Sequence, residues 1–164
     1  MFRILTVLVP DLRSERWELG LSRFIAPYYA FLDFGAEVVL ASPLGGLPFD
    51  GLSGLDRVSG DLVRRFSADS TAREAVLDTL SLDQVCIDDF DAAFCLGAIW
   101  EESVLEGVGR IMAGCMESGK TVVAVPSGSD MPPRGPGRGL LILVGSEAPS
   151  ELGAKALLGA LGRK

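Results

Sequence analysis

Short apolar runs alternate along this chain with longer segments whose apolar residues recur at helical spacing. An uninterrupted apolar run predicts a strand buried on both faces, because a half-exposed strand would alternate apolar and polar side chains. The predicted strands are residues 2–9, 37–41, 92–96, 121–125 and 139–144. The first and the fourth offer no polar face, so we expect both to lie inside the sheet rather than at an edge.

The segments between these runs predict helices over residues 16–34, 61–66, 71–80, 101–118 and 149–161. Pro27 lies inside the first helix and is expected to kink or restart it, since proline lacks an amide donor. Gly35 is expected to end the same helix. Strands separated by helices favour parallel β-α-β units. We therefore predict an α/β fold: a single doubly wound, flavodoxin-like parallel sheet with the first strand central and helices on both faces.

A length of 164 residues is most simply one domain that spans residues 1–164. The net charge is −7, from 15 basic and 22 acidic residues, and no cluster of lysine or arginine stands out. We therefore expect neither nucleic acid nor a membrane as a partner. No apolar stretch has the length or flanks of a transmembrane span or a signal peptide. The 3 cysteines, an odd number in segments expected to be buried, predict a reduced cytoplasmic protein.

Several sequence segments follow one another in the order of a known family. These segments are residues 27–31, 35–38, 41–46, 65–80, 88–94 and 145–161. Together they resemble the ThiJ/PfpI superfamily of class I glutamine amidotransferase-like proteins, and in particular its glyoxalase III and heat-shock chaperone branch. Residues 119–128 resemble the segment in which a strand of that superfamily runs into its nucleophile elbow. The resemblance implies the flavodoxin-like fold and a pocket built around a nucleophilic cysteine.

The catalytic positions that this resemblance implies are occupied by other residues. Pro126 stands at the position of the cysteine, Ser127 at that of its histidine neighbour, and Arg23 at that of the pocket glutamate. Residues 97–100 stand in place of a Gly-Gly-His-Gly loop, of which only the first glycine remains. The chain contains no histidine, so neither a Cys-His nor a Ser-His pair can form within it. The degenerate ligand pocket that the resemblance implies consists of Arg23, Gly97, Ala98, Trp100, Pro126, Ser127 and Gly128.

Two other side chains are candidates for a nucleophile. Ser127 has Asp130 close by in the sequence, but a Ser-Asp pair lacks a base of suitable pKa, and both residues are typical of turns. Cys95, which ends the third predicted strand, is the better candidate thiol, although free cysteines are most often buried packing residues. Cys86 and Cys115 are expected to be packing residues too. Scattered cysteines without histidine predict no metal site.

Residues 114–121 match the phosphate-binding pattern G-x-x-x-x-G-K-[ST] letter for letter. A working loop of this kind follows a strand and opens a helix, so that backbone N–H groups face the phosphates. Here the pattern closes a predicted helix and enters a predicted strand. We therefore interpret Gly119 as a helix cap, Lys120 as a helix-end cation and Thr121 as strand.

Two classes of function remain open from the sequence. The first is a non-catalytic ThiJ/PfpI-like protein with a binding, scaffolding or stress-associated role. Its pocket would prefer a small anionic ligand, because Arg23 replaces an acid. The second is a residual small-molecule activity, either a glyoxalase- or deglycase-like lyase or an amidase, through a relocated thiol such as Cys95. No cofactor is expected in either. The first is favoured because the nucleophile and its partners are replaced together.

The segment between the elbow and the last predicted strand is short. Members of the resembled family carry another helix and several strands there, whereas this chain has only residues 126–138. We expect the shortened chain to expose apolar surface at that edge of the sheet and to form a homodimer. The alternative is a monomer in which the glycine- and proline-rich residues 132–139 cover the gap.

Overall fold

The computed structural model of the protein describes residues 1–10, 21–46, 60–97, 102–126, 139–145 and 148–162. Within these residues, 6 strands form one sheet in the order β3-β2-β1-β4-β5-β6, and every neighbouring pair is parallel. The strands are β1 (Arg3–Val9), β2 (Glu37–Ser42), β3 (Leu80–Ser81), β4 (Ala92–Gly97), β5 (Thr121–Pro126) and β6 (Leu141–Leu143). Apart from the short β3, this is the predicted flavodoxin-like order with the first strand central.

β1 and β5 both lie inside the sheet. β5 pairs with β4 on one side and with β6 on the other, and all of its residues are buried. β1 lies between β2 and β4 and is buried from Ile4 to Val9. The prediction from their unbroken apolar runs is therefore confirmed.

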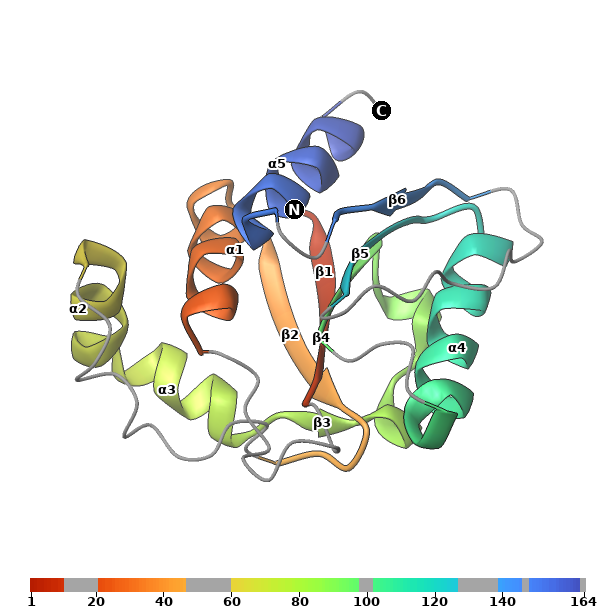
Figure 1. Cartoon of the computed structure of the whole chain (residues 1–164), viewed down its shortest axis with the longest axis horizontal. Helices are drawn as coiled ribbons and strands as arrows, with labels where there is room; N and C mark the ends of the chain where they lie inside the picture. Colours follow the sequence, from red (N-terminus) through yellow and green to blue (C-terminus); the bar gives the residue numbers. More distant parts are fainter. Residues whose placement is uncertain (11–20, 47–59, 98–101, 127–138, 146–147, 163–164) are drawn as a thin grey trace.

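Helices cover both faces of the sheet, as predicted (Figure 1). One face carries α1 (Leu21–Asp33), α2 (Asp61–Ala68), α3 (Ser70–Leu77) and α5 (Ser150–Leu161). The other face carries α4 (Glu102–Glu117) and the 3₁₀ turns η2 (Leu82–Gln84) and η3 (Ile87–Asp89). Because side chains alternate along a strand, β1 supplies Ile4 and Leu8 to the first core and Val7 to the second.

α1 runs through Pro27 without a break, so the helix does not restart at this residue. Pro27 has no N–H to donate to the carbonyl oxygen of Arg23, one helical turn earlier. The hydroxyl of Ser150, the first residue of α5, donates to that oxygen at 2.5 Å. A side chain from the far end of the chain thus replaces the missing helical bond and ties α5 to α1. Gly35 ends α1 as predicted, with a φ of 84°.

β3 is a strand that the sequence pattern did not predict, because the third helix was expected to reach residue 80. α3 ends at Leu77, and the Thr79 hydroxyl donates to the carbonyl oxygen of Val76 at 2.7 Å. The chain then pairs Leu80 and Ser81 with the end of β2. Ser81 at once opens η2, where its N–H donates to the Gln84 side chain at 2.9 Å.

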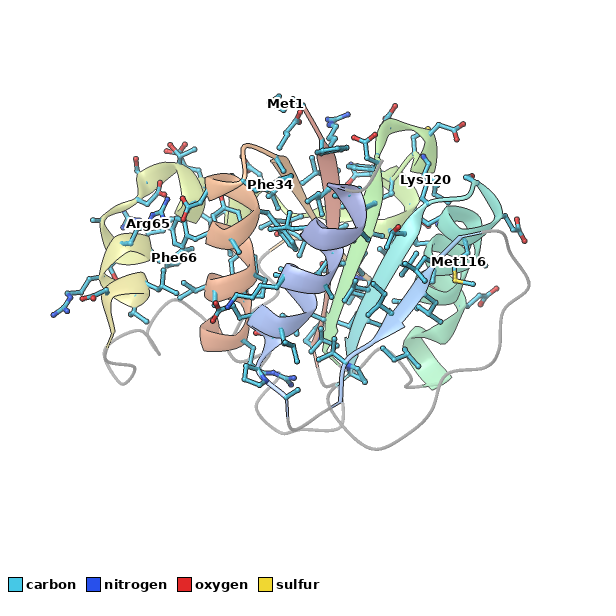
Figure 2. The ribbon with its side chains drawn as sticks, turned by 90° about the horizontal axis from the view of Figure 1, so that it is seen from above. Met1, Phe34, Arg65, Phe66, Met116 and Lys120 are labelled. Atoms are coloured by element: carbon cyan, nitrogen blue, oxygen red, sulfur yellow. The ribbon has the colours of Figure 1, made fainter. Side chains whose placement is uncertain are left out.

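α2 is anchored on α1 by one arginine and one aromatic side chain (Figure 2). Arg65 donates to both carboxylate oxygens of Asp33, at 2.9 and 2.7 Å, and its guanidinium lies 3.9 Å from the centre of the Tyr29 ring. Phe66 is buried and meets Phe24 edge-on. These contacts hold α1 from the side opposite α5, so the helix that carries Arg23 is held on two sides.

Candidate functional site

Three strands end in register at the carboxyl end of the sheet. Val9 of β1 is paired with Gly97 of β4, and Gly97 is paired with Pro126 of β5. Ligands of open α/β sheets bind at this end of the strands. Two predicted pocket residues, Gly97 and Pro126, are therefore neighbours there. Four others, Ala98, Trp100, Ser127 and Gly128, lie outside the described residues.

Pro126 closes β5 and ends its pairing with β6. The N–H of Val122 donates to Leu140 at 2.8 Å, and the N–H of Val144 donates to Ala124 at 2.9 Å. Every second residue of β5 thus faces β6, and the next donor on that side would come from residue 126. Proline has no N–H, so the ladder stops there. The same residue has no nucleophilic atom, so the position that the family resemblance assigns to the nucleophile performs no covalent chemistry.

Gly97 adopts a backbone conformation that favours glycine, with a φ of 114°. It is buried and is the last residue of β4. A side chain at this position would be strained by the backbone alone. Gly97 therefore offers only backbone atoms to the carboxyl end of the sheet.

Arg23 brings a positive charge to the start of α1. Its Nη2 atom is fully buried, and no hydrogen-bond acceptor of the described residues lies within bonding distance of it. Its carbonyl oxygen is held by Ser150, so the first turn of α5 lies against the first turn of α1. Both helices begin at the carboxyl end of the parallel strands, where helix N-termini add positive potential. A half-buried guanidinium with one buried, unsatisfied nitrogen beside helix N-termini favours an anion.

Cys95 lies in the core beneath α4, away from the strand-end surface. It is fully buried, with Val7 and Ile111 in the same cluster, and burial raises the pKa of its thiol far above the ordinary value. Burial also raises the pKa of Cys115, to about 11. Since the thiolate is the reactive form, neither thiol is activated as a nucleophile.

Cys86 is exposed, which corrects the expectation that it packs in the core. Its neighbours are the buried Val85 and the half-buried Ile87, so the local sequence resembles a core segment. The residue is the N-cap of η3, however, and precedes β4. Its thiol therefore lies toward the amino ends of the strands, opposite the candidate site.

The phosphate-binding pattern of residues 114–121 has the structural context that the sequence analysis inferred. α4 ends at Glu117, Gly119 has a φ of 72°, and β5 starts at Thr121. The Lys120 ammonium donates to the carbonyl oxygen of Ile87 at 2.6 Å, which closes the turn onto η3. This lysine is committed to a structural bond at the amino end of β5. Within the described residues, no group of three or more Cys, Asp and Glu side chains is placed to hold a metal ion.

The fold resembles several solved structures. No protein-family model matches this sequence, and no curated protein matches it. The ThiJ/PfpI domain protein of Brachyspira murdochii superposes with a TM-score of 0.57 at 14% identity, over 99% of this chain and 97% of that one. This chain has the ThiJ/PfpI fold.

Longer proteins share the ThiJ/PfpI fold with this chain. Glyoxalase III of Candida albicans matches with a TM-score of 0.61 at 18% identity, over 77% of this chain and 57% of that one. The Rapid Encystment Protein of 24 kDa from Francisella tularensis matches with a TM-score of 0.60 at 22% identity, over 76% and 58%. This chain thus spans less than two thirds of either protein. None of the helices in the described residues is long and apolar enough to cross a membrane.

Proposed function

We propose that this protein is a non-catalytic, ThiJ/PfpI-like binding protein, related to the glyoxalase III and heat-shock chaperone branch, that takes a small anionic ligand at the carboxyl end of its sheet. Residues 1–164 would form one domain with a cytoplasmic scaffolding or stress-associated role. The observation that carries the proposal is the Arg23 guanidinium, whose buried Nη2 atom has no acceptor among the described residues.

The chemistry of the pocket supports binding rather than turnover. Arg23 stands at the position of an acid in the resembled family, so the charge of the pocket is inverted. A guanidinium nitrogen withdrawn from water costs free energy unless an acceptor is present. A carboxylate or phosphate at this point would accept a charge-assisted hydrogen bond from Nη2 and gain from the nearby helix N-termini.

The nucleophile position argues against the catalytic alternative. Pro126 offers no nucleophile, and the chain has no histidine to act as a base. Cys95 is buried on the face of the sheet that α4 covers, opposite α1, and burial raises the pKa of its thiol. Removing one member of a catalytic set can leave residual rate, but here the nucleophile, its base and the acid are all replaced.

A thermal-shift series tests the ligand class. We expect acetate, pyruvate and inorganic phosphate to raise the unfolding temperature, while the neutral analogues acetamide and acetone leave it unchanged. Arg23→Gln should abolish the anion response because it removes the charge. Arg64→Gln is the matched control, since Arg64 is a surface cation that pairs only locally with Asp61 on α2. Equal responses to anions and neutral analogues would refute the proposed ligand.

A turnover assay tests the absence of catalysis. We expect no conversion of methylglyoxal or of a model amide above the uncatalysed rate, in the wild type or in Cys95→Ala. Thiol-dependent turnover that disappears in Cys95→Ala would establish the residual lyase or amidase activity instead.

A further inference from the structure

The carbonyl oxygen of Arg23 receives a hydrogen bond that its own helix cannot supply. In an α-helix this oxygen accepts from the N–H four residues later, and Pro27 has none. Ser150 of α5 donates to it instead, at 2.5 Å. Pro27 and Ser150 are both buried, so water has little access to this carbonyl oxygen. The bond from α5 therefore replaces a helical bond rather than adding to one.

The hydroxyl of Ser150 serves α1 rather than its own helix. A serine at the start of a helix commonly caps it, by accepting from a backbone N–H two or three residues later. In α5 the N-cap is Pro149, which makes no side-chain capping bond, and Ser150 is the first helical residue. Its side chain is 6% exposed and donates to α1. The serine therefore contributes to the contact between the two helices and not to the start of α5.

α5 has a fixed position on the sheet. Gly153 lies one turn after Ser150, on the same side of the helix. A Cβ at Gly153 would lie 2.9 Å from a methyl group of Val125 and 3.2 Å from the Phe94 ring, so the helix backbone lies directly on β4 and β5. Such close packing leaves α5 little freedom to slide over the strands. Ser150 therefore reaches α1 from a rigid support.

The first turn of α1 has few hydrogen bonds of its own. Leu21 begins the helix, so the first four N–H groups have no partner within it. Other side-chain bonds attach to α1 further along: the Tyr29 hydroxyl donates to Asp69, and Asp33 accepts from α2. Ser150 instead holds the backbone of Arg23 itself. The residue that carries the candidate anion-binding group is thus fixed from α5.

We propose that Ser150 is a positioning residue of the anion site: its hydroxyl fixes the backbone of Arg23, so that α5 sets where the guanidinium lies. This inference rests on the proposed function, because it assigns a second residue to the same site. A hydrogen bond to a ligand weakens steeply with distance and angle. The burial of Nη2 limits how far the Arg23 side chain adjusts when its backbone moves. Pro27 is part of the device, since without it α1 would hold the carbonyl oxygen alone.

This arrangement makes anion binding and the docking of α5 depend on each other. If α5 strengthens binding by holding Arg23, a bound anion stabilises the docking of α5 by the same factor, because binding free energies are linked. A helix that supplied its own bond to Arg23 would lack this link. We therefore expect a bound anion to slow backbone hydrogen exchange in α5 more than in α4, which covers the other face of the sheet.

Calorimetric titration with inorganic phosphate and with acetate measures the effect on the site. We expect Ser150→Ala to raise the anion dissociation constants roughly three- to tenfold, as for the loss of one hydrogen bond. Pro27→Ala restores a helical N–H, so the Pro27→Ala/Ser150→Ala protein should bind anions about as tightly as the wild type. Ser67→Ala is the matched control, since the Ser67 hydroxyl also donates to a backbone carbonyl, that of Val63 within α2. It should leave anion affinity unchanged.

The outcomes separate this inference from the proposed ligand. A serine with a merely structural role would lower stability in Ser150→Ala and leave the anion dissociation constants unchanged, which overturns the inference alone. Weakened binding that Pro27→Ala fails to restore also overturns it, because the effect of Ser150 then does not pass through the Arg23 carbonyl. So does an anion that binds without slowing exchange in α5. A wild type that binds neither phosphate nor acetate overturns the proposed ligand and this inference together.

Discussion

The two ends of the strands in this sheet are built differently. At the amino ends, the starts of β1 and β5 are tied to neighbouring segments. The N–H of Arg3 donates to Asp91 at 2.7 Å, its side chain pairs with Glu37 at 2.9 Å, and the Lys120 ammonium donates to Ile87. Figure 2 shows Lys120 beside Met116 at the end of α4, on this side of the molecule.

The carboxyl ends carry features that cost stability or add none. Gly97 has a φ of 114°, Pro126 ends the ladder to β6, and Arg23 keeps a buried nitrogen without an acceptor in the described structure. In proteins of this class the stabilising contacts and the binding groups separate in this way, because a site must leave some groups unsatisfied until its ligand arrives. This difference between the two ends supports the site proposed at the carboxyl end.

The largest expected effect is on the free energy of unfolding and distinguishes the two ends of β6. Gly139 precedes β6, and a Cβ there would collide with the backbone of Met116 and Lys120. We expect Gly139→Ala to lower the free energy of unfolding by about 1–3 kcal/mol. Gly145 follows β6 with open space around it, so Gly145→Ala should change stability by less than about 0.5 kcal/mol. Urea denaturation measures both, and equal losses would contradict the contrast.

A substitution at the carboxyl end should stabilise the protein. Arg23→Met removes the unpartnered nitrogen and keeps the aliphatic stem, so we expect a gain of about 1 kcal/mol without ligand and no response to anions. Thr6→Val is the control, since the Thr6 hydroxyl is also buried without a partner but lies mid-strand in β1. It should give a similar gain while the anion response persists. An Arg23→Met protein that loses stability would show that this arginine is structural.

The smallest expected effect on stability tests the amino end of β1. Asp91→Ala removes the acceptor of the Arg3 N–H, and we expect a loss of about 0.5–1 kcal/mol, because the group is exposed and water partly replaces the carboxylate. Asp88→Ala, which removes the same charge from the exposed η3 turn, is the control for net charge. The anion-induced thermal shift should be the same in both variants. A changed shift in Asp91→Ala alone would mean that the two ends are coupled.

The sequence was sufficient for the main strands and for most of the helices. Unbroken apolar runs such as that of β5 predict buried parallel strands, because burial on both faces excludes polar side chains. Gly97 and Pro126 each directly follow a predicted strand. Their meeting at one edge of the sheet was therefore predictable, since parallel strands end on the same side. These properties depend on local pattern and on general rules of topology.

Other features depended on contacts that local pattern does not contain. β3 is too short to show a period, and its pairing depends on the end of β2. The exposure of Cys86 follows from its place as the N-cap of a 3₁₀ turn, which its apolar neighbours conceal. A groove beside β6 exists because α5 lies over β5 and leaves the last strand uncovered.

What the sequence by itself determined is the α/β order of elements and the absence of any pair of a histidine with a cysteine or serine, because the absence of histidine is a fact of covalent structure. What only the tertiary structure decided is how Arg23 is held. Pro27 removes the helical donor to the carbonyl oxygen of Arg23, and Ser150 restores it from 127 positions away. Nothing local to α1 specifies that bond, since it forms only when α5 packs across the sheet. The Nη2 atom of its guanidinium is buried and has no acceptor among the described residues.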